Sequence, residues 1–475
     1  MSPSEHTLSQ QLAAFAAGVV ADGAPEEVRA SVRQRILDIV GLQAAALPLD
    51  TSQAVLGFVE AQGGPARAHV VGTDTLAPPG WAAFLNGSLA HSLDYDDTHL
   101  PSVLHPSASV VPAGLAAAEH HGVSGPVILD AVAVGIEVAV RLGMAGYDRE
   151  TNDSVYFAHG QHATSICGTV ASAVTASLLA GAGEDGVVDA IGVAASMASG
   201  IIEGNRTGGT IKRLHCGWAA HAGVTASELV AAGITGPPTA LEGRFGLFEA
   251  FLHGRVATDE VVDGLGDQWA VPSIFFKPYP ANHFTHSGLD AARRLADAGL
   301  TPDDVSEAVL GVAGSTARTI GEPLQVKQRP ETGYQAQFSG PYLVAVGLFG
   351  GHGLGASLDD FTDELATDPD RRALMARIRV EADARCEEIY PYQFPAVLTV
   401  RTRDGRELVE EVLVNRGGPQ DPLTDDELTE KFRGNALRSF DDTAADAVHA
   451  AVEALAVDGG AGAVLAPFAT RPTVN

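Results

Sequence analysis

The chain has 475 residues, of which 45% are hydrophobic and 19% are charged. This length allows about two to four domains, and the apolar content excludes a mainly disordered protein. There are 30 Lys and Arg residues against 59 Asp and Glu, which gives a formal net charge of −29. Because no basic run interrupts this acidic background, nucleic acids and anionic membranes are poor partners.

The first residues lack the basic and apolar regions of a signal peptide, and no apolar run approaches the roughly 20 residues needed to span a bilayer. We therefore expect a cytoplasmic protein. The three cysteines, Cys167, Cys216 and Cys386, lie far apart and form no CxxC pair. Because disulfide scaffolds and structural zinc sites need suitably spaced cysteines, the sequence predicts neither of them and no metal centre.

Residues 1–270 are rich in Ala, Leu and Val, and small or apolar side chains recur at helical spacing. Most segments carry Ser, Thr, Asp or Pro near the start and Gly near the end, which indicates helix boundaries. Several are apolar nearly all round, as is typical of buried, closely packed helices. We expect helices over 25–47, 80–93, 110–121, 128–145, 163–181, 187–202 and 218–232.

The pattern changes near Trp269. Alternating β-branched residues predict strands over 305–314, 378–382, 396–401 and 407–414, with Asp404-Gly405 as a hairpin turn between the last two. Helices are expected over 287–298 and 340–349, and amphipathic helices return from Thr424 onward. The sequence thus predicts a mainly α protein with three parts. They are a helical domain over 1–270, an α+β domain over 271–420, and the returning helical part over 421–475.

The densest group of ionisable residues is HSLDYDDTHLPSVLHPS, residues 91–107, which follows an apolar helix. Asp94 and Asp97 are spaced i, i+3 and are expected to share a helix face. His105 is expected on an irregular segment just before a new helix near Ser107, since prolines end the preceding one. A position near a helix N-terminus favours a neutral imidazole and bound anions.

A simpler interpretation of the same segment is a helix-capping loop in contact with solvent. This alternative accounts well for Asp96 and His99. It accounts less well for the whole set of acidic and histidine residues directly after such an apolar helix. Histidines are also concentrated beyond this segment, because 12 of the 16 in the chain fall between His91 and His286. Such clustering indicates acid–base chemistry or anion binding, although each single histidine is more often structural.

Three further segments carry candidate functional residues. His162 lies in HGQHAT, where the HxxH pattern is weak evidence for a metal. Arg206 and Lys212 flank a Gly-Gly loop and form a candidate anion site in an acidic protein. Lys277 lies in KPYPANHFTH at the expected domain boundary, where ligand clefts tend to form. The chain lacks P-loop, GxSxG and HExxH motifs, which disfavours nucleotide-binding, serine-hydrolase and zincin functions.

Taken in order, these segments resemble the MmgE/PrpD family, which includes 2-methylcitrate dehydratase, cis-aconitate decarboxylase and iminodisuccinate epimerase. The resemblance covers essentially the whole chain. It is carried by HSLDYDDTH…HPS at 91–107, HATSICG at 162–168, KRLHCGWAAHAG at 212–223, EGRFGLFEAF at 242–251 and KPYPANHFTH at 277–286. It implies a large all-helical domain built from both chain ends, a smaller inserted α+β lid, a homodimer and chemistry without a cofactor.

The resemblance also implies which residues form the active site. The expected catalytic residues are His105, Asp94, His162 and Lys212. The expected substrate-binding residues are Thr98, Arg206, Lys277, Asn282, His286 and Tyr342. Two features depart from the decarboxylase pattern: the stretch HLPSVL between Thr98 and His105 is one residue longer, and Asn282 stands where a histidine is usual. Both changes affect positions that would set substrate choice.

The resemblance implies a lyase that dehydrates or decarboxylates a small di- or tricarboxylate. Carbanion charge beside a carboxylate needs cations, which Lys212, Lys277 and Arg206 would supply. His105 would be the general acid or base, and Asp94 would orient or charge an imidazole such as that of His105 or His162. An epimerase or isomerase would use the same proton abstraction. A non-catalytic anion-binding protein is a second alternative, and a metalloenzyme is the least favoured.

Overall fold

The computed structural model describes residues 6–204 and 209–472. The chain forms two compact units. Unit 1 takes the chain up to Ile274 and again from Phe432 onward, and unit 2 takes Phe275–Lys431. The units therefore change at 274/275 and 431/432, whereas the sequence predicts domain limits at 270/271 and 420/421. No helix among the described residues is long and apolar enough to cross a membrane.

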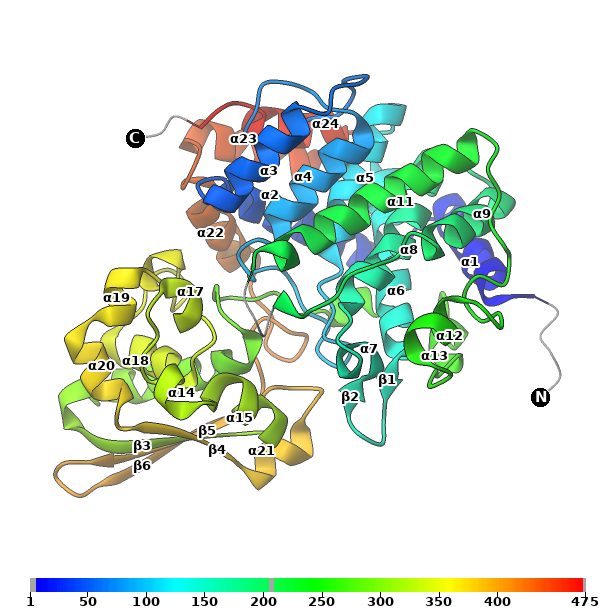
Figure 1. The fold of residues 1–475 in the computed structure, drawn as a ribbon. Coiled ribbons are helices and arrows are strands. Elements are labelled where there is room, and N and C mark those ends of the chain that lie inside the picture. Colours follow the sequence, from blue (N-terminus) through cyan, green and yellow to red (C-terminus); the bar gives the residue numbers. More distant parts are fainter. Residues whose placement is uncertain (1–5, 205–208, 473–475) are drawn as a thin grey trace. The chain divides into compact units, whose positions relative to one another are not determined.

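Unit 1 is built almost entirely from helices (Figure 1). Its longer helices are α1 (Leu8–Asp22), α2 (Glu26–Ala46), α3 (Asp50–Glu60), α4 (Pro79–His91), α5 (Ser107–His121), α6 (Pro126–Ala145), α8 (Ala163–Leu179), α9 (Glu184–Ala195), α11 (His215–Ala231) and α23 (Asp442–Ala454). Its shorter elements are β1 (Tyr147–Asp148), β2 (Asp153–Ser154), α7 (Val155–Ala158), η1 (Ile211–Leu214), α12 (Leu247–Leu252), α13 (Asp259–Val262), η2 (Val271–Ser273), α24 (Ala461–Leu465) and η6 (Ala466–Phe468). Helix α22 (Asp425–Ala436) spans the second junction between the units.

Most of the helices expected in this region are present, with boundaries shifted by a few residues. The helix expected over 187–202 is an exception, because α9 ends at Ala195 and the following residues are irregular. Ile201 in that stretch is 67% exposed, so its apolar side chain contributes nothing to a helix face. The sequence patterns do not separately predict helices α1 and α3.

Small residues let the central helices approach closely. Helix α11 packs against both α4 and α8, and Figure 1 shows the three running alongside one another. A Cβ atom added at Gly217 would lie only 2.2 Å from the carbonyl oxygen of Phe84, and one at Gly87 would lie 2.9 Å from the Cα of Gly217. The crossing of α4 and α11 therefore requires glycine at both positions. It brings the end of α4 beside the start of α11.

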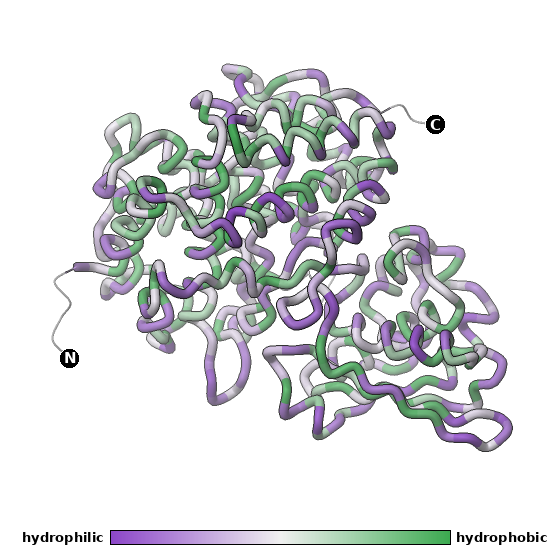
Figure 2. The backbone as a smooth tube through the Cα atoms, turned by 180° about the vertical axis from the view of Figure 1, so that it is seen from behind, coloured by the Kyte–Doolittle hydropathy of each residue, from purple (hydrophilic) through white to green (hydrophobic). Residues whose placement is uncertain are grey.

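Unit 2 contains a mixed four-stranded sheet in the order β4-β3-β5-β6. The strands are β3 (Val305–Val312), β4 (Ile378–Ala382), β5 (Ala396–Thr402) and β6 (Glu407–Val412). β3 pairs in parallel with β4 and antiparallel with β5, which pairs antiparallel with β6. The predicted hairpin turn is confirmed, since Gly405 has φ of 89° between β5 and β6. Figure 2 shows the turns of this hairpin and of β1–β2 as hydrophilic segments.

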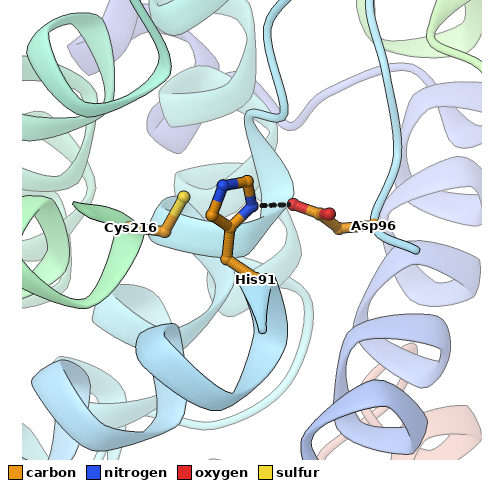
Figure 3. A group of neighbouring side chains, drawn as sticks. All are labelled: His91, Asp96 and Cys216. Carbon is orange, nitrogen blue, oxygen red and sulfur yellow. Dashed lines mark hydrogen bonds and ion pairs between the residues drawn. The ribbon is translucent and has the colours of Figure 1, made fainter. Parts of the chain in front are cut away.

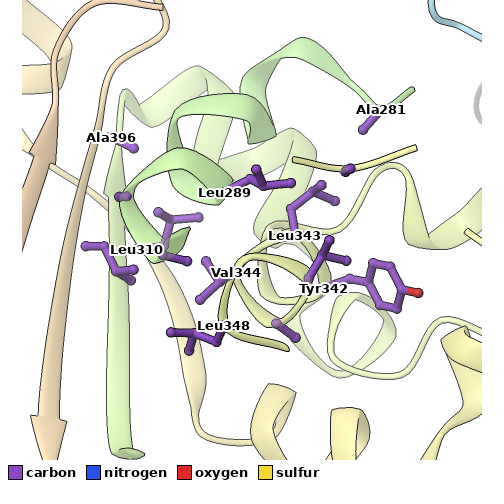
Figure 4. Packing of buried hydrophobic residues seen from close by; sticks show 14 of the residues in the cluster. Ala281, Leu289, Leu310, Tyr342, Leu343, Val344, Leu348 and Ala396 are labelled. Atoms are coloured by element: carbon purple, nitrogen blue, oxygen red, sulfur yellow. The ribbon is translucent and has the colours of Figure 1, made fainter. Parts of the chain in front are cut away.

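Helices cover the sheet of unit 2 and close its core. They are η3 (His283–Thr285), α14 (His286–Asp297), η4 (Pro302–Asp304), α15 (Gly314–Gly321), α16 (Leu324–Lys327), α17 (Gly333–Ala336), α18 (Gly340–Phe349), η5 (Leu358–Asp360), α19 (Asp363–Thr367), α20 (Pro369–Met375) and α21 (Ala384–Ile389). Helix α14 packs on β5 and β6, and α18 packs on α14. Leu289, Leu310 and Leu343 meet in the core that results (Figure 4).

Candidate active site

The segment between α4 and α5 carries most of the predicted site. Helix α4 ends at His91, and α5 begins at Ser107 as expected. Asp94, three residues after the end of α4, has a φ of 52°, in the left-handed region, so it is not helical. The expectation that Asp94 and Asp97 share a helix face is therefore wrong. Both lie on an irregular segment that packs inside unit 1.

This segment is buried rather than solvated. Asp96 is 0% exposed and His99 is 9% exposed, so the alternative of a capping loop in contact with water is wrong for both residues. His99 Nδ1 lies 2.7 Å from Ser102 Oγ. Burial lowers the pKa of His99 to about 4, so the ring is neutral at physiological pH.

A buried ion pair holds the segment in place. Arg35, on α2, donates from one guanidinium nitrogen to Asp97 Oδ2 at 2.7 Å, and both side chains are at most 2% exposed. The other terminal nitrogen donates to the carbonyl oxygens of Val271 at 3.0 Å and Ile274 at 2.8 Å. Ser107 Oγ donates to the same Asp97 oxygen at 2.5 Å. Asp97 is thus held by α2 and by the first turn of α5.

The same residue fixes the orientation of His105. His105 Nδ1 lies 2.7 Å from the backbone carbonyl oxygen of Asp97. Because a carbonyl oxygen can only accept a hydrogen bond, Nδ1 must carry the proton. In the neutral ring, Nε2 then keeps its lone pair. Thr98 Oγ1 lies 3.4 Å from the same Nδ1, and the His105 amide donates to Thr164 Oγ1 at 3.3 Å.

Asp96 is the carboxylate closest to the imidazoles in these contacts. Its Oδ2 lies 2.7 Å from His91 Nδ1 and 3.9 Å from His105 Nδ1. Figure 3 marks the first of these contacts with a dashed line. The ring centroids of His91 and His105 are 5.3 Å apart. Asp96 therefore faces two imidazoles, one of which is the predicted general acid or base.

Two further histidines extend this group into an array. His162, directly before α8, has its ring centroid 5.6 Å from that of His91 and 4.9 Å from that of His215. The Nδ1 atoms of His162 and His215 are 3.0 Å apart, so one donates to the other. Burial holds the pKa of His162 well below its usual value and lowers that of His215 to about 4. Both rings are therefore neutral near pH 7.

Lys212 brings a positive charge to the same region. It lies on η1, and its Nζ is 3.4 Å from Asp94 Oδ1. Its side chain is 22% exposed. The structure thus brings together Asp94, Thr98, His105, His162 and Lys212 within unit 1. Arg206, predicted to bind substrate, lies outside the described residues.

The other predicted binding residues belong to unit 2. Lys277 is 1% exposed, and His286 Nε2 donates to the Ala281 carbonyl oxygen at 3.1 Å. Asn282 caps η3 by accepting from the Phe284 amide at 3.1 Å. Tyr342 is fully buried, and its hydroxyl donates to the Asp360 carbonyl oxygen at 2.6 Å. Their roles toward a substrate stay predictions.

Sequence reasoning missed four residues of this region as site residues. His91 and Asp96 lie in the segment that the analysis singled out, so their position was a usable signal. His215 and Cys216 lie three and four residues after the predicted Lys212. One ligand atom each from His91, Asp96 and Cys216 lies within 4.8 Å of the others, so these three are suited to hold a metal ion. No such group was predicted.

The Arg35–Asp97 pair yields a stability prediction. Replacing Arg35 by Met leaves the Asp97 carboxylate buried without its cation, so we expect the free energy of unfolding to fall by about 3–5 kcal/mol. Arg33→Met, on the same helix, is the matched control. Arg33 pairs at 3.6–3.7 Å with two largely exposed glutamates, so its loss should cost at most about 1 kcal/mol. Urea unfolding measures both; equal losses would contradict the account.

His99 yields a prediction on pH. Its pKa is about 4 when folded and near 6.5 when unfolded, so the unfolded chain binds more protons below pH 6.5. Stability from this group is present above pH 6.5 and is lost as the pH falls toward 4. When the pH is lowered from about 7.5 to about 5.5, the free energy of unfolding should fall by about 1 kcal/mol less in His99→Gln than in the wild type. Parallel urea titrations at the two pH values check this, and identical losses would refute it.

Comparison with known proteins places this chain in a family. The family model described as the MmgE/PrpD N-terminal domain matches residues 10–259, and that of the MmgE/PrpD C-terminal domain matches residues 279–456. Human cis-aconitate decarboxylase is 30% identical over 77% of this chain and 74% of its own length.

Two fungal proteins are similar over more of the chain. The cis-aconitate decarboxylase-like protein oryM of Aspergillus oryzae is 28% identical over 88% of this chain and 89% of its own. A cis-aconitate decarboxylase of Aspergillus terreus is 25% identical over 90% of this chain and 88% of its own. The family matches and the human relative together show that the chain belongs to the MmgE/PrpD family.

Proposed function

We propose that this protein is a lyase that removes CO₂ from a small tricarboxylate of the cis-aconitate type. One observation carries the proposal: His105 donates through Nδ1 to the Asp97 carbonyl, which leaves Nε2 available for proton transfer. Support also comes from the relatives, which are named cis-aconitate decarboxylases.

The chemistry requires a proton donor and a counter-charge. When CO₂ leaves a carboxylate, the electron pair of the broken C–C bond stays on the substrate and must be taken up by a proton at carbon. A protonated His105 would deliver that proton from Nε2 while Nδ1 stays on the Asp97 carbonyl. Asp96, 3.9 Å from Nδ1, would stabilise the imidazolium before transfer.

The substrate's negative charges need cations in an acidic protein. Lys212 acts electrostatically on His162 of the array, and its Nζ lies 3.4 Å from Asp94 Oδ1. A fixed ammonium offsets charge that develops beside a carboxylate, and it acts without rearranging solvent. We propose the same role for Arg206 and Lys277. Thr98, Asn282, His286 and Tyr342 remain proposed substrate-binding residues.

The neutral histidines suit a different role. His162 and His215 carry no charge near pH 7, so they can exchange hydrogen bonds with a substrate without attracting it electrostatically. The His105 side chain is 10% exposed, and its ring faces the Asp96 carboxylate. This difference favours His105 as the acid and His162 as an orienting donor or acceptor.

Other reactions of the family use the same residues. A dehydratase or an epimerase would also need an imidazole and a fixed cation, so the identity of the product decides between them. A non-catalytic anion-binding protein would bind the carboxylates without turnover. The homodimer, the absence of a cofactor and the cytoplasmic location stay predictions.

The test is turnover of a carboxylate panel followed by ¹H NMR and CO₂ release. The panel holds cis-aconitate, trans-aconitate, citrate, 2-methylcitrate and iminodisuccinate. We expect CO₂ from cis-aconitate. His105→Gln should lower kcat by at least about 100-fold with little change in KM. His99→Gln, which removes another buried imidazole of the same segment, is the control and should keep most activity.

Each contrary result points to one alternative. Water loss or epimerisation without CO₂ would replace the decarboxylase by the corresponding activity. Thermal stabilisation by these ligands without any turnover would support the anion-binding protein. Full activity of His105→Gln would remove His105 from the mechanism.

A further inference from the structure

Three different metal-ligand types meet beside His105. His91 is the last residue of α4, Asp96 lies on the irregular segment that follows, and Cys216 lies in the first turn of α11. One ligand atom from each lies within 4.8 Å of the others, and all three residues are buried. Figure 3 shows the His91 ring between the Asp96 carboxylate and the Cys216 sulfur. The close crossing of α4 and α11 at Gly217 brings these residues together.

We propose that His91, Asp96 and Cys216 form a binding site for a thiophilic divalent cation such as Zn²⁺. An imidazole nitrogen, a carboxylate oxygen and a thiolate sulfur are the ligands that Zn²⁺ accepts in tetrahedral sites. Three protein ligands leave a fourth position for water. The ligand atoms need to close by about 1 Å to reach tetrahedral spacing, which side-chain rotation at His91 and Cys216 supplies.

The His91 imidazole supports this assignment. Its Nδ1 bonds to Asp96, and its Nε2 has no hydrogen-bond partner within residues 6–204 and 209–472, although the side chain is only 1% exposed. A buried polar atom without a partner costs free energy. An ion at Nε2 would give this atom a partner, and Asp96 would then leave Nδ1 to become a ligand, because the two ring nitrogens point away from each other. The nitrogen that does not bind the ion keeps the proton.

The charges near the site also suit a dication. The ion-paired neighbours already balance one another: Arg35 with Asp97, and Lys212 with Asp94. A bound Zn²⁺ would be neutralised by the Asp96 carboxylate and the Cys216 thiolate. The metal–sulfur bond forms as the thiol proton leaves to solvent, so no oxidant or reductant is needed. The loaded site carries no net charge, which lowers the cost of burying it.

Occupancy of this site should inhibit the enzyme. The Asp96 carboxylate that faces His105 at 3.9 Å would become a metal ligand and would no longer be available to the His105 ring. This consequence rests on the proposed function, whereas binding of the ion does not. The two claims are therefore tested separately.

Binding is tested with Co²⁺ added to chelator-treated, tag-free, full-length protein under anaerobic conditions. Co²⁺ is the probe because thiolate coordination gives it a charge-transfer absorption band that aqueous Co²⁺ lacks. We expect one Co²⁺ per chain with this band, and displacement of Co²⁺ by Zn²⁺. Cys216→Ala should abolish the band. Cys167→Ala, which removes an equally buried thiol outside the group, is the matched control and should keep it.

Two further variants keep the test decisive. Cys216→Ser preserves side-chain size and should also lose the band, so it replaces Cys216→Ala if that protein does not fold by circular dichroism. Asp96→Asn should weaken Co²⁺ binding at least about 10-fold. Absence of a stoichiometric band in the wild type, or an unchanged band in a folded Cys216 variant, would overturn the site.

Inhibition is read from turnover of the active substrate. One equivalent of Zn²⁺ should suppress wild-type activity at least about 10-fold and affect Cys216→Ser much less. Full activity of the Zn²⁺-loaded wild type would refute the coupling to His105. Stoichiometric Co²⁺ binding by a protein that turns over none of the carboxylates would leave the site standing and contradict the proposed function.

Discussion

The buried ion pair between Arg35 and Asp97 is the contact on which the candidate site depends. Two ionised groups in an apolar interior are costly unless each is fully hydrogen-bonded. Arg35 donates to one carboxylate and two backbone carbonyls, and Asp97 accepts from Arg35 and Ser107. The segment that carries the site is therefore held at a single position. Because the carbonyl oxygen of the same Asp97 accepts a hydrogen bond from His105 Nδ1, the pair also leaves Nε2 as the nitrogen with a lone pair.

Burial also distinguishes the histidines by charge. It keeps His162 and His215 neutral by lowering the pKa of each ring, whereas His105 retains some exposure and faces the Asp96 carboxylate. Charge enters the region through Lys212, which is tied to Asp94. A small anionic substrate would thus meet a proton that His105 can transfer and the fixed ammonium group of Lys212. This is the minimum that breaking a bond beside a carboxylate requires.

Local sequence patterns predicted the elements of the fold well wherever the pattern itself was strong. The alternation at β3, β4, β5 and β6 and the Asp-Gly turn gave the hairpin and the strands of unit 2. The parallel pairing of β3 with β4 carries no local signal, because it joins residues far apart in sequence. The helix expected over 187–202 extended too far because its apolar residues continue past Ala195 without a core to face.

The candidate site was predictable where its residues stand in local sequence motifs. Asp94, Thr98, His105, His162 and Lys212 stand in recognisable motifs, and the structure brings them together. Arg35 stands in no motif, since a buried arginine on a long helix gives no sign of its distant partner. Asp96 and His99 were read as solvated because charged and polar residues usually are. Their burial depends on how the segment packs between α4, α5 and α2, which only the tertiary structure shows.

The central claim is that the Asp97 carbonyl fixes the protonated nitrogen of His105. The direct measurement is ¹⁵N NMR of histidine-labelled protein near pH 8, with the His105 signals assigned by their loss in His105→Gln. The account predicts that neutral His105 carries its proton on Nδ1, with Nε2 showing the chemical shift of an unprotonated nitrogen. A neutral His105 protonated on Nε2 would contradict it, since the Asp97 carbonyl then receives no hydrogen bond and the reactive nitrogen is the wrong one.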